Sequence, residues 1–368
     1  MIVIGTRPEA IKLAPVVLAA RRRSSEFDVL VVRTSQHREM LDQVLANFDL
    51  RADVDLDIMK ADQDQVYVTT EALRKLRDVM VAERPDWVIV QGDTTTTFAG
   101  ALAAFYQRTR VAHVEAGLRT YDKQQPFPEE TNRCLTTRLS DLHCAPIAGA
   151  RDNLLREGIA AAQVVVTGNT AIDALLYTLE RAGHVPGASA DNEPHRLLLT
   201  AHRRENHGAP LERICTAILT LLERHPQLEV HCPVHLNPHV RASVFARLSN
   251  HPRVSLTEPL DYRAFVLAMH RAHLILTDSG GIQEEAPTLG KPVLVLRDTT
   301  ERHEAVQSGT ALLVGTDPER IIAQASKLLV DRSHYASMSQ RANPYGDGQA
   351  ATRILDAITT RQSTKRES

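Results

Sequence analysis

Short apolar runs alternate with amphipathic helical patterns along nearly the whole chain, and this alternation constrains the fold more than any other feature. Short strands separated by helices form parallel sheets whose two faces are both covered. The runs fall into two series, so the sequence predicts an α/β protein with two doubly wound sheets. The first series is Ile2–Ile4, Val29–Val32, Trp87–Val90, Val111–Val114, Leu142–Cys144 and Val164–Val166, and the second is Leu197–Leu199, Leu228–His231, Arg253–Leu256, His273–Leu276, Pro292–Leu296 and Ala311–Val314.

The length of 368 residues also favours two domains, because a single core rarely grows so large. The helical patterns include Thr69–Glu83 and Leu211–Arg224, and the stretch Gly183–Pro194 between the two series is weakly patterned. A last helix, Gln349–Ile358, follows the turn-rich NPYGDG, and Lys365–Glu367 reads as a frayed tail. We expect an N-terminal domain at residues 1–168, a C-terminal domain at 169–345, and a segment at 346–368 whose helix crosses back to the N-terminal domain.

Charge and cysteine content exclude several classes of function. The net charge is −2, which gives no electrostatic reason to expect nucleic acid or an anionic membrane as a partner. Neither a signal peptide nor an apolar run of transmembrane length is evident. The four cysteines form no C-x-x-C pair and suggest free thiols in a reducing cytoplasm; they are Cys134, Cys144, Cys215 and Cys232.

Three acids follow strands of the first series and are candidates for acid/base chemistry. Ligands bind outside the carboxyl ends of parallel strands, and Asp93, Glu115 and Glu129 stand near such ends. Clustered carboxylates perturb each other's pKa values and suit general acid/base work. Simpler roles remain open: Asp93 could cap a helix, Arg119 could pair with Glu115, and one acid of the Glu129–Glu130 pair could only cap a helix.

The segment Gly5-Thr6-Arg7-Pro8-Glu9-Ala10-Ile11-Lys12 joins the first strand to a helix and supplies positive charge through Arg7 and Lys12. It matches neither a dinucleotide-binding nor a Walker A pattern. A plain turn with surface charges explains the segment equally well.

Two segments of the second series suit a nucleoside diphosphate. His202, Arg203 and Arg204 follow one strand, where arginine would bind phosphate oxygens in bidentate fashion, although a solvated Arg-Glu cluster is the alternative. In the segment 277–287, TDSGGIQEEAP, the backbone N–H groups of Ser279, Gly280 and Gly281 would hold phosphates at a helix start.

The acids in TDSGGIQEEAP fit a nucleotide better than inorganic phosphate. Glu285, one turn into the helix, would accept the ribose hydroxyls, and Glu284 would face away. Arg302 lies downstream. His231, His235 and His239 suggest zinc by their spacing, but Pro233 and Pro238 interrupt the helix that would align them.

Ten motifs in the same order give the chain a specific resemblance to the non-hydrolysing UDP-N-acetylglucosamine 2-epimerases of bacteria. They are GTRPEAIK, QHREMLDQV, QGDTTTTFAGALAAFY, HVEAGLRTY, PFPEETNR, VTGNTAIDAL, TAHRRENHG, PVHLNP, DSGGIQEEAPTLGKPVLVLRDTTER and NPYGDG. The resemblance implies a GT-B architecture, with two Rossmann-like domains and a cleft between them that closes on the substrate. It also implies a cytoplasmic homodimer that uses neither NAD nor a metal.

The implied reaction interconverts UDP-GlcNAc and UDP-ManNAc for surface polysaccharide synthesis. UDP is eliminated across C1 and C2 to give a bound 2-acetamidoglucal, and UDP then adds back with protonation of the other face. The resemblance assigns catalysis to Asp93, Glu115, Glu129 and His202. It assigns substrate binding to Arg7, Lys12, Arg133, Ser279, Gly280, Gly281, Glu285 and Arg302.

Many bacterial members are also activated by their own substrate at a second site. Gln36, Glu129, Arg203 and His235 match positions associated with that site. Glu39 and Asp62 depart from the pattern of some members and add negative charge, which argues against activation by an anion here.

Other functions remain open from the sequence. A GT-B glycosyltransferase would bind the same UDP-sugar, although three acids argue against it. A 2-epimerase of a modified sugar, such as a 2,3-diacetamido uronic acid, would share the motifs. A non-catalytic UDP-sugar sensor would keep DSGGIQEE but lose the acids, all of which stand here.

Overall fold

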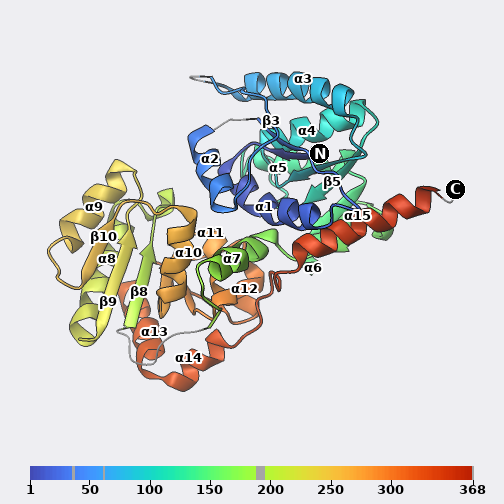
Figure 1. Cartoon of the computed structure of the whole chain (residues 1–368). Helices are drawn as coiled ribbons and strands as arrows, with labels where there is room; N and C mark the ends of the chain where they lie inside the picture. Colours follow the sequence, from blue (N-terminus) through green and yellow to red (C-terminus); the bar gives the residue numbers. More distant parts are fainter. Residues whose placement is uncertain (35–37, 61–62, 188–194, 367–368) are drawn as a thin grey trace. The chain divides into compact units, whose positions relative to one another are not determined.

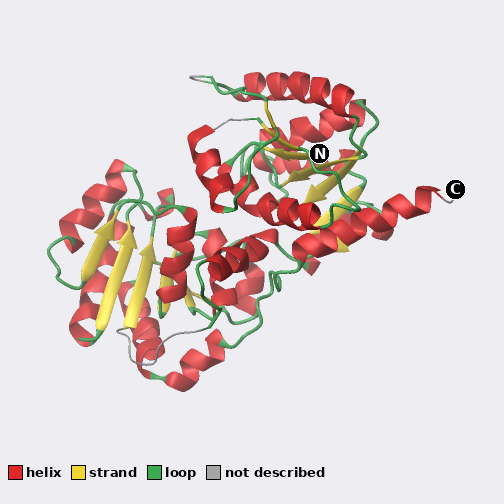
Figure 2. Ribbon diagram, viewed as in Figure 1, coloured by secondary structure: helices red, strands yellow, loops and turns green. Residues whose placement is uncertain are grey.

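The computed structural model describes residues 1–34, 38–60, 63–187 and 195–366. The chain divides into two compact units, which are described separately. Unit 1 contains Met1–Tyr177 and Gly346–Ser368, and unit 2 contains Thr178–Tyr345. Each unit is a parallel sheet flanked by helices (Figures 1 and 2).

The sheet of unit 1 has seven strands in the order β3-β2-β1-β4-β5-β6-β7, and all paired strands are parallel. Its central strands are buried apolar runs, as expected for a sheet covered on both faces. The strands are β1 Ile2–Ile4, β2 Val31–Arg33, β3 Val54–Asp55, β4 Trp87–Gln91, β5 Arg110–Val114, β6 Leu142–Ala145 and β7 Val164–Val166.

The helices that accompany this sheet begin at recognisable caps. Asp64 caps α3 by accepting the Tyr67 N–H, and Thr94 caps α4 by accepting the Thr97 N–H. The α-helices are α1 Arg7–Arg22, α2 Arg38–Asn47, α3 Gln65–Glu83, α4 Thr95–Tyr106, α5 Glu129–Leu139, α6 Ala148–Arg156, α7 Thr170–Arg181 and α15 Ala350–Arg366, with a short 3-10 helix, η1, at Ala161–Gln163.

The C-terminal helix α15 packs on unit 1. Asp173 of α7 accepts the N–H groups of Ala350 and Ala351 at 3.2 and 2.9 Å, which caps the start of α15. The predicted helix end at Ile358 is wrong, because α15 continues to Arg366. Lys365 and Arg366 are therefore helical rather than frayed, and Glu367 lies outside the described residues.

The sheet of unit 2 has six parallel strands in the order β10-β9-β8-β11-β12-β13. Its core joins β8, β9 and β11 to α8 and α13. The strands are β8 His195–Thr200, β9 Leu228–Pro233, β10 Val254–Thr257, β11 Leu274–Thr277, β12 Val293–Val295 and β13 Ala311–Leu313. The helices are η2 Arg204–Asn206, α8 Ala209–Arg224, α9 Pro238–Leu248, α10 Tyr262–Arg271, α11 Gly280–Glu285, η3 Ala286–Leu289, α12 His303–Gln307, α13 Pro318–Val330 and α14 Arg332–Ser339.

The prediction of two parallel α/β sheets is confirmed, and all twelve predicted runs overlap strands. The sequence missed β3, which has only two residues. Part of the weakly patterned stretch, residues 188–194, lies outside the described residues. Within the described part of the chain, no helix is long and apolar enough to cross a membrane.

Candidate functional site

Each sheet reverses its strand order once, and the predicted site residues gather at these reversal points. In unit 1 the reversal lies between β1 and β4, and in unit 2 it lies between β8 and β11. The helices that follow the strands leave opposite faces of the sheet there, which opens a crevice at the carboxyl ends. The motifs GTRPE and QGD follow β1 and β4, and AHRREN and DSGG follow β8 and β11.

The turn after β1 is held against the start of α4. A side chain at Gly5 would place its Cβ 2.4 Å from the Thr96 hydroxyl, so this close approach requires glycine. Arg7 follows as the first residue of α1 and is half-buried. The turn thus presents the start of α1 at the carboxyl edge of the sheet.

Glu9 ties the loops after β1 and β4 together. Its carboxylate is buried and accepts the N–H groups of Gly5 and Thr6 at 2.9 and 2.6 Å, and the hydroxyls of Thr94 and Thr97 at 2.6 and 2.9 Å. Burial raises the pKa of Glu9, although these hydrogen bonds oppose the rise. The sequence analysis did not single out Glu9, which is a structural acid inside a motif expected to bind ligand.

Glu115 lies at the end of β5 and pairs with Lys12. The Lys12 Nζ is 2.5 Å from the Glu115 Oε2, and the Gln91 amide donates to the same oxygen at 3.0 Å. Glu115 has a φ of 64°, a left-handed conformation that turns the chain sharply after the strand. The alternative pairing with Arg119 is wrong, because Arg119 binds Glu157 at 2.6 Å.

Asp93 lies beside these groups and pairs with Arg133. The Arg133 guanidinium donates to the Asp93 carboxylate, and the Asn132 amide donates to the Asp93 carbonyl at 3.0 Å. Burial raises the pKa of Asp93, and the charge of Glu115 adds to the rise while Arg133 and Lys12 oppose it. Asp93 and Glu115 therefore form one electrostatically coupled cluster with two cations.

The two adjacent acids that begin α5 have different environments. Glu130 is 2% exposed and accepts the N–H groups of Thr120 and Tyr121 at 3.1 and 2.9 Å. It also lies 3.3 Å from the Arg133 guanidinium. Glu129 is partly exposed. Glu130 is thus the structural acid of the pair, and Glu129 remains the candidate for chemistry.

In unit 2, the buried Asp278 joins the loops after β8 and β11. Its Oδ2 accepts the N–H groups of His202 and Arg203 at 2.8 and 2.9 Å, and the Asn206 amide at 2.9 Å. Its Oδ1 lies 3.1 Å from the His202 Nδ1. Burial raises the pKa of Asp278, but the bonds from His202 and the Arg203 N–H outweigh burial and lower it overall.

The start of α11 differs in one respect from the expected phosphate cradle. The Ser279 N–H donates to the Thr277 hydroxyl at 2.9 Å, so the N–H that was predicted to hold phosphate already has an acceptor here, and its contact with phosphate stays a prediction. Gly280 and Gly281 begin α11, and their N–H groups have no acceptor within the helix.

Arg302 lies over the glycine at the start of α11. A side chain at Gly280 would place its Cβ 3.3 Å from the Arg302 guanidinium. Arg302 donates to Glu284 at 2.5 Å, and Glu284 is only 4% exposed. The expectation that Glu284 faces away is therefore wrong. Glu285 is half-buried, and its charge adds to burial in raising the pKa of Tyr262.

Comparison with known proteins agrees with this geometry. A family model described as UDP-N-acetylglucosamine 2-epimerase matches residues 19–359. The chain is 50% identical to the UDP-N-acetylglucosamine 2-epimerase of Bacillus subtilis over 100% of its own length and 96% of that protein. It is 49% identical to the Escherichia coli K12 protein of the same name, with 97% of each chain covered.

The chain belongs to the UDP-N-acetylglucosamine 2-epimerase family. Members of this family are isomerases, and the chain is an enzyme of this kind. Its fold matches the UDP-GlcNAc 2-epimerase of Neisseria meningitidis, which was solved bound to UDP-GlcNAc: 48% identity, a TM-score of 0.86, and coverage of 98% of this chain and 99% of that chain. A glycosyltransferase at 12% identity and a TM-score of 0.65 shares the GT-B fold alone.

The predicted second-site residues of this epimerase are only partly described. Gln36 and Asp62 lie outside the described residues, as does the side chain of Glu39. Arg203 donates to the Asp278 carbonyl at 2.9 Å and to Glu301 at 3.1 Å, whereas Arg204 is exposed. His235 is exposed and stacks on His202, with ring centroids 5.4 Å apart. Burial and the charge of His202 lower the pKa of His235.

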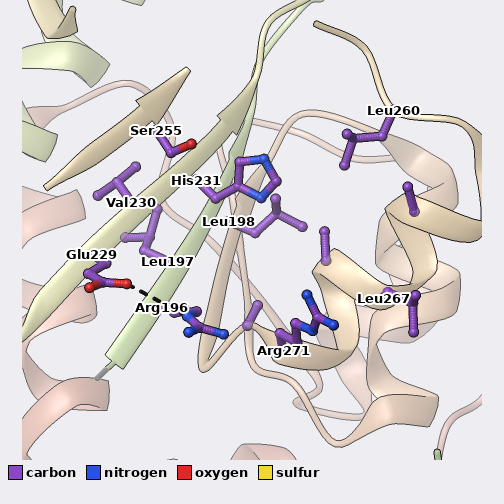
Figure 3. A pocket seen from close by; sticks show the side chains of 13 residues that line it. Arg196, Leu197, Leu198, Glu229, Val230, His231, Ser255, Leu260, Leu267 and Arg271 are labelled. Carbon is purple, nitrogen blue, oxygen red and sulfur yellow. Dashed lines mark ion pairs between the residues drawn. The ribbon is translucent and has the colours of Figure 1, made fainter. Parts of the chain in front are cut away.

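One pocket of unit 2 is lined by other residues than these. It has a volume of about 480 Å³ and lies between the sheet and α10, where Leu198, His231 and Arg271 line it (Figure 3). Of the three histidines whose spacing suggested zinc, His231 has its Nε2 3.1 Å from the Thr257 hydroxyl. Over residues 1–34, 38–60, 63–187 and 195–366, no three His, Cys, Asp or Glu side chains are grouped to hold a metal.

Proposed function

We propose that the chain interconverts UDP-GlcNAc and UDP-ManNAc without hydrolysis, by eliminating UDP and adding it back. The observation that supports this most is the cluster of Asp93 and Glu115 with Lys12 and Arg133 at the ends of β4 and β5. The hydrogen on C2 of the sugar has no adjacent carbonyl to acidify it, so removing this proton to leave a carbanion is too slow. In an elimination no carbanion has to form, because UDP departs from C1 with an electron pair as the C2–H bond breaks.

In the first step, a carboxylate takes the proton from C2 while the C1–O bond breaks and UDP leaves with the electron pair. The product is a 2-acetamidoglucal with a double bond between C1 and C2. In the second step, a UDP oxygen bonds to C1 and an acid delivers a proton to the other face of C2. Neither step removes a hydride from the sugar, so the proposed route does not use a nicotinamide.

Unit 1 supplies the acid/base groups in this proposal. Asp93, Glu115 and Glu129 are the candidates for moving the C2 proton. The raised pKa of Asp93 suits a group that gives a proton in one direction and takes it in the other. Lys12 and Arg133 supply the positive charge that stabilises the departing diphosphate, and Arg7 at the start of α1 adds to it.

Unit 2 supplies the groups that hold UDP. The N–H groups of Gly280 and Gly281, the Ser279 hydroxyl and Arg302 would bind the diphosphate. Glu285 would accept the ribose hydroxyls. His202, held by Asp278, would contact the diphosphate with its exposed edge.

The decisive experiment is to incubate the purified chain with UDP-GlcNAc alone in D₂O and to follow proton NMR. We expect UDP-ManNAc to appear with deuterium at C2, and Asp93→Asn to slow its appearance by at least about 10²-fold. Release of free ManNAc and UDP would indicate a hydrolysing enzyme instead. Binding of UDP-GlcNAc without exchange would overturn the proposal and favour a modified sugar as substrate.

We also propose a cytoplasmic homodimer whose product supplies surface polysaccharide synthesis. Helices α3 and α4 pack against each other, and together they carry four large apolar side chains that are more than half exposed: Val66, Val81, Phe105 and Tyr106. Such a surface is typical of a protein interface. Light scattering should give about twice the chain mass of 40.8 kDa, and Phe105→Asp should reduce it to the monomer value.

A further inference from the structure

Asp278 has a buried carboxylate whose two oxygens have different contacts. The Oδ2 accepts three hydrogen bonds, from the N–H groups of His202 and Arg203 and from the Asn206 amide. The Oδ1 lies 3.1 Å from the His202 Nδ1. The residue is 0% exposed, so water does not compete for either oxygen.

Asp278 is therefore held more rigidly than a salt bridge alone requires. The three donors to Oδ2 come from the loop after β8, whereas Asp278 itself follows β11. Its own N–H donates to the Thr200 carbonyl at 3.2 Å, and the Asn206 amide also donates to the Leu296 carbonyl at 3.1 Å. This network fixes the direction in which Oδ1 points.

The orientation of the His202 ring decides which of its two nitrogens can reach a ligand. The His202 side chain is 40% exposed although its Nδ1 edge faces the buried carboxylate, and His235 stacks on the ring at 5.4 Å. The opposite edge, which carries Nε2, is therefore the one available to a ligand. A buried carboxylate 3.1 Å from one imidazole nitrogen attracts a proton to that nitrogen and favours one orientation of the ring.

We propose that Asp278 is a positioning residue for the epimerisation: it holds the His202 ring by its Nδ1 edge and so directs Nε2 toward the UDP diphosphate. This inference rests on the proposed function for the identity of the ligand, but the geometry of the Asp278–His202 pair does not depend on it. Because diphosphate oxygens only accept hydrogen bonds, the ring in this complex donates from Nε2 to the diphosphate and from Nδ1 to Asp278.

The variant Asp278→Asn separates positioning from loop structure. Its side-chain oxygen can still accept the three bonds that Oδ2 accepts. Its NH₂ group would then face His202 Nδ1, which has to become an acceptor, so the neutral ring shifts its proton to Nε2. Asn206→Ala is the matched control, because it removes a bond to Oδ2 and leaves the Oδ1–His202 pair in place.

The first readout is ¹⁵N NMR of histidine-labelled protein, with His202 assigned by its loss in His202→Gln. We expect the neutral ring to carry its proton on Nδ1 in the wild type and in Asn206→Ala, and on Nε2 in Asp278→Asn. An unchanged tautomer in Asp278→Asn would overturn the proposal. This measurement needs no turnover, so it stands even if the chain fails to epimerise UDP-GlcNAc.

The second readout is kinetic. We expect Asp278→Asn to lower kcat about 10²- to 10⁴-fold with a change in KM below about threefold, and to have no further effect in a His202→Gln background. A larger effect on KM than on kcat, or equal losses in both backgrounds, would show that Asp278 only holds the loop. Absence of wild-type turnover would instead refute the proposed function.

Discussion

Two neighbouring carboxylates, Glu129 and Glu130, show how roles are divided at the scale of single residues. Glu130→Ala should lower the free energy of unfolding by about 2–3 kcal/mol, because the N–H groups of Thr120 and Tyr121 and the Arg133 guanidinium lose a buried acceptor. Glu129→Ala should change stability by less than about 0.5 kcal/mol but slow epimerisation at least about 10²-fold. Urea unfolding and turnover of UDP-GlcNAc measure the two effects.

The two variants are each other's control, since they differ by one position in α5. Equal losses of stability would contradict the division of roles. Full activity in Glu129→Ala would remove Glu129 from the proposed chemistry and leave Asp93 and Glu115 as the acid/base groups.

The sequence could locate these motifs but could not distinguish reactive acids from structural ones. A carboxylate after a strand predicts a site, and Asp93 and Glu115 do lie together. Glu9, Glu130 and Asp278 have the same local signature, yet each is occupied by backbone N–H donors. The donors to Glu9 are local, because Thr6 and Glu9 form a capping box that the sequence could have shown. The donors to Glu130 and Asp278 lie farther along the chain, so only the folded chain shows that these two acids are satisfied.

At the scale of helices and strands, apolar runs predicted the buried strands well because parallel strands covered on both faces read as continuous apolar segments. The two-residue β3 is too short to give such a signal. The end of α15 was missed for a different reason. Beyond Ile358 the apolar pattern stops, but no glycine or proline interrupts the helix before Arg366.

The junction between α7 and α15 should make stability depend on pH. Burial raises the pKa of Asp173 from 3.8 to about 6. Between these two pH values the folded chain therefore keeps a proton on Asp173 that the unfolded chain has lost. The stability from this group is fully present below pH 3.8 and falls as pH rises to about 6. Relative to Asp173→Asn, the wild type should lose about 1.4 kcal/mol per pH unit across that window.

Urea unfolding of both proteins at several pH values tests this dependence. Asp347→Asn, at the start of the same junction, is the matched control, because stability should depend on pH in the opposite direction there. The hydrogen bond from Arg353 lowers the pKa of Asp347, so the stability that Asp347 contributes is present above its unfolded pKa and is lost as pH falls. A stability difference between wild type and Asp173→Asn that stays constant with pH would refute the assignment.

At the scale of the whole molecule, the chain has two units with separate cores, so we expect bound UDP to stabilise the unit that binds it more than the other unit. The core of unit 1 includes Val3, Val88 and Val90, and the core of unit 2 includes Leu197, Leu274 and Leu276. The proposed UDP groups, among them Gly280 and Glu285, belong to unit 2. A ligand stabilises the folded state that binds it, by about 2.7 kcal/mol at a hundred times its Kd.

UDP should therefore increase the protection of unit 2 from hydrogen exchange, and this increase should depend on Glu285 but not on Asp93. Hydrogen exchange followed by mass spectrometry distinguishes the units, with β8 and β11 reporting unit 2 and β4 and β5 reporting unit 1. Glu285→Gln should abolish most of the added protection in unit 2, because the ribose loses its carboxylate acceptor. Asp93→Asn should retain that protection, since it alters the acid/base cluster of unit 1 and leaves the nucleotide-binding groups of unit 2 intact. Loss of protection in Asp93→Asn alone would place UDP binding in unit 1 and reverse the assignment.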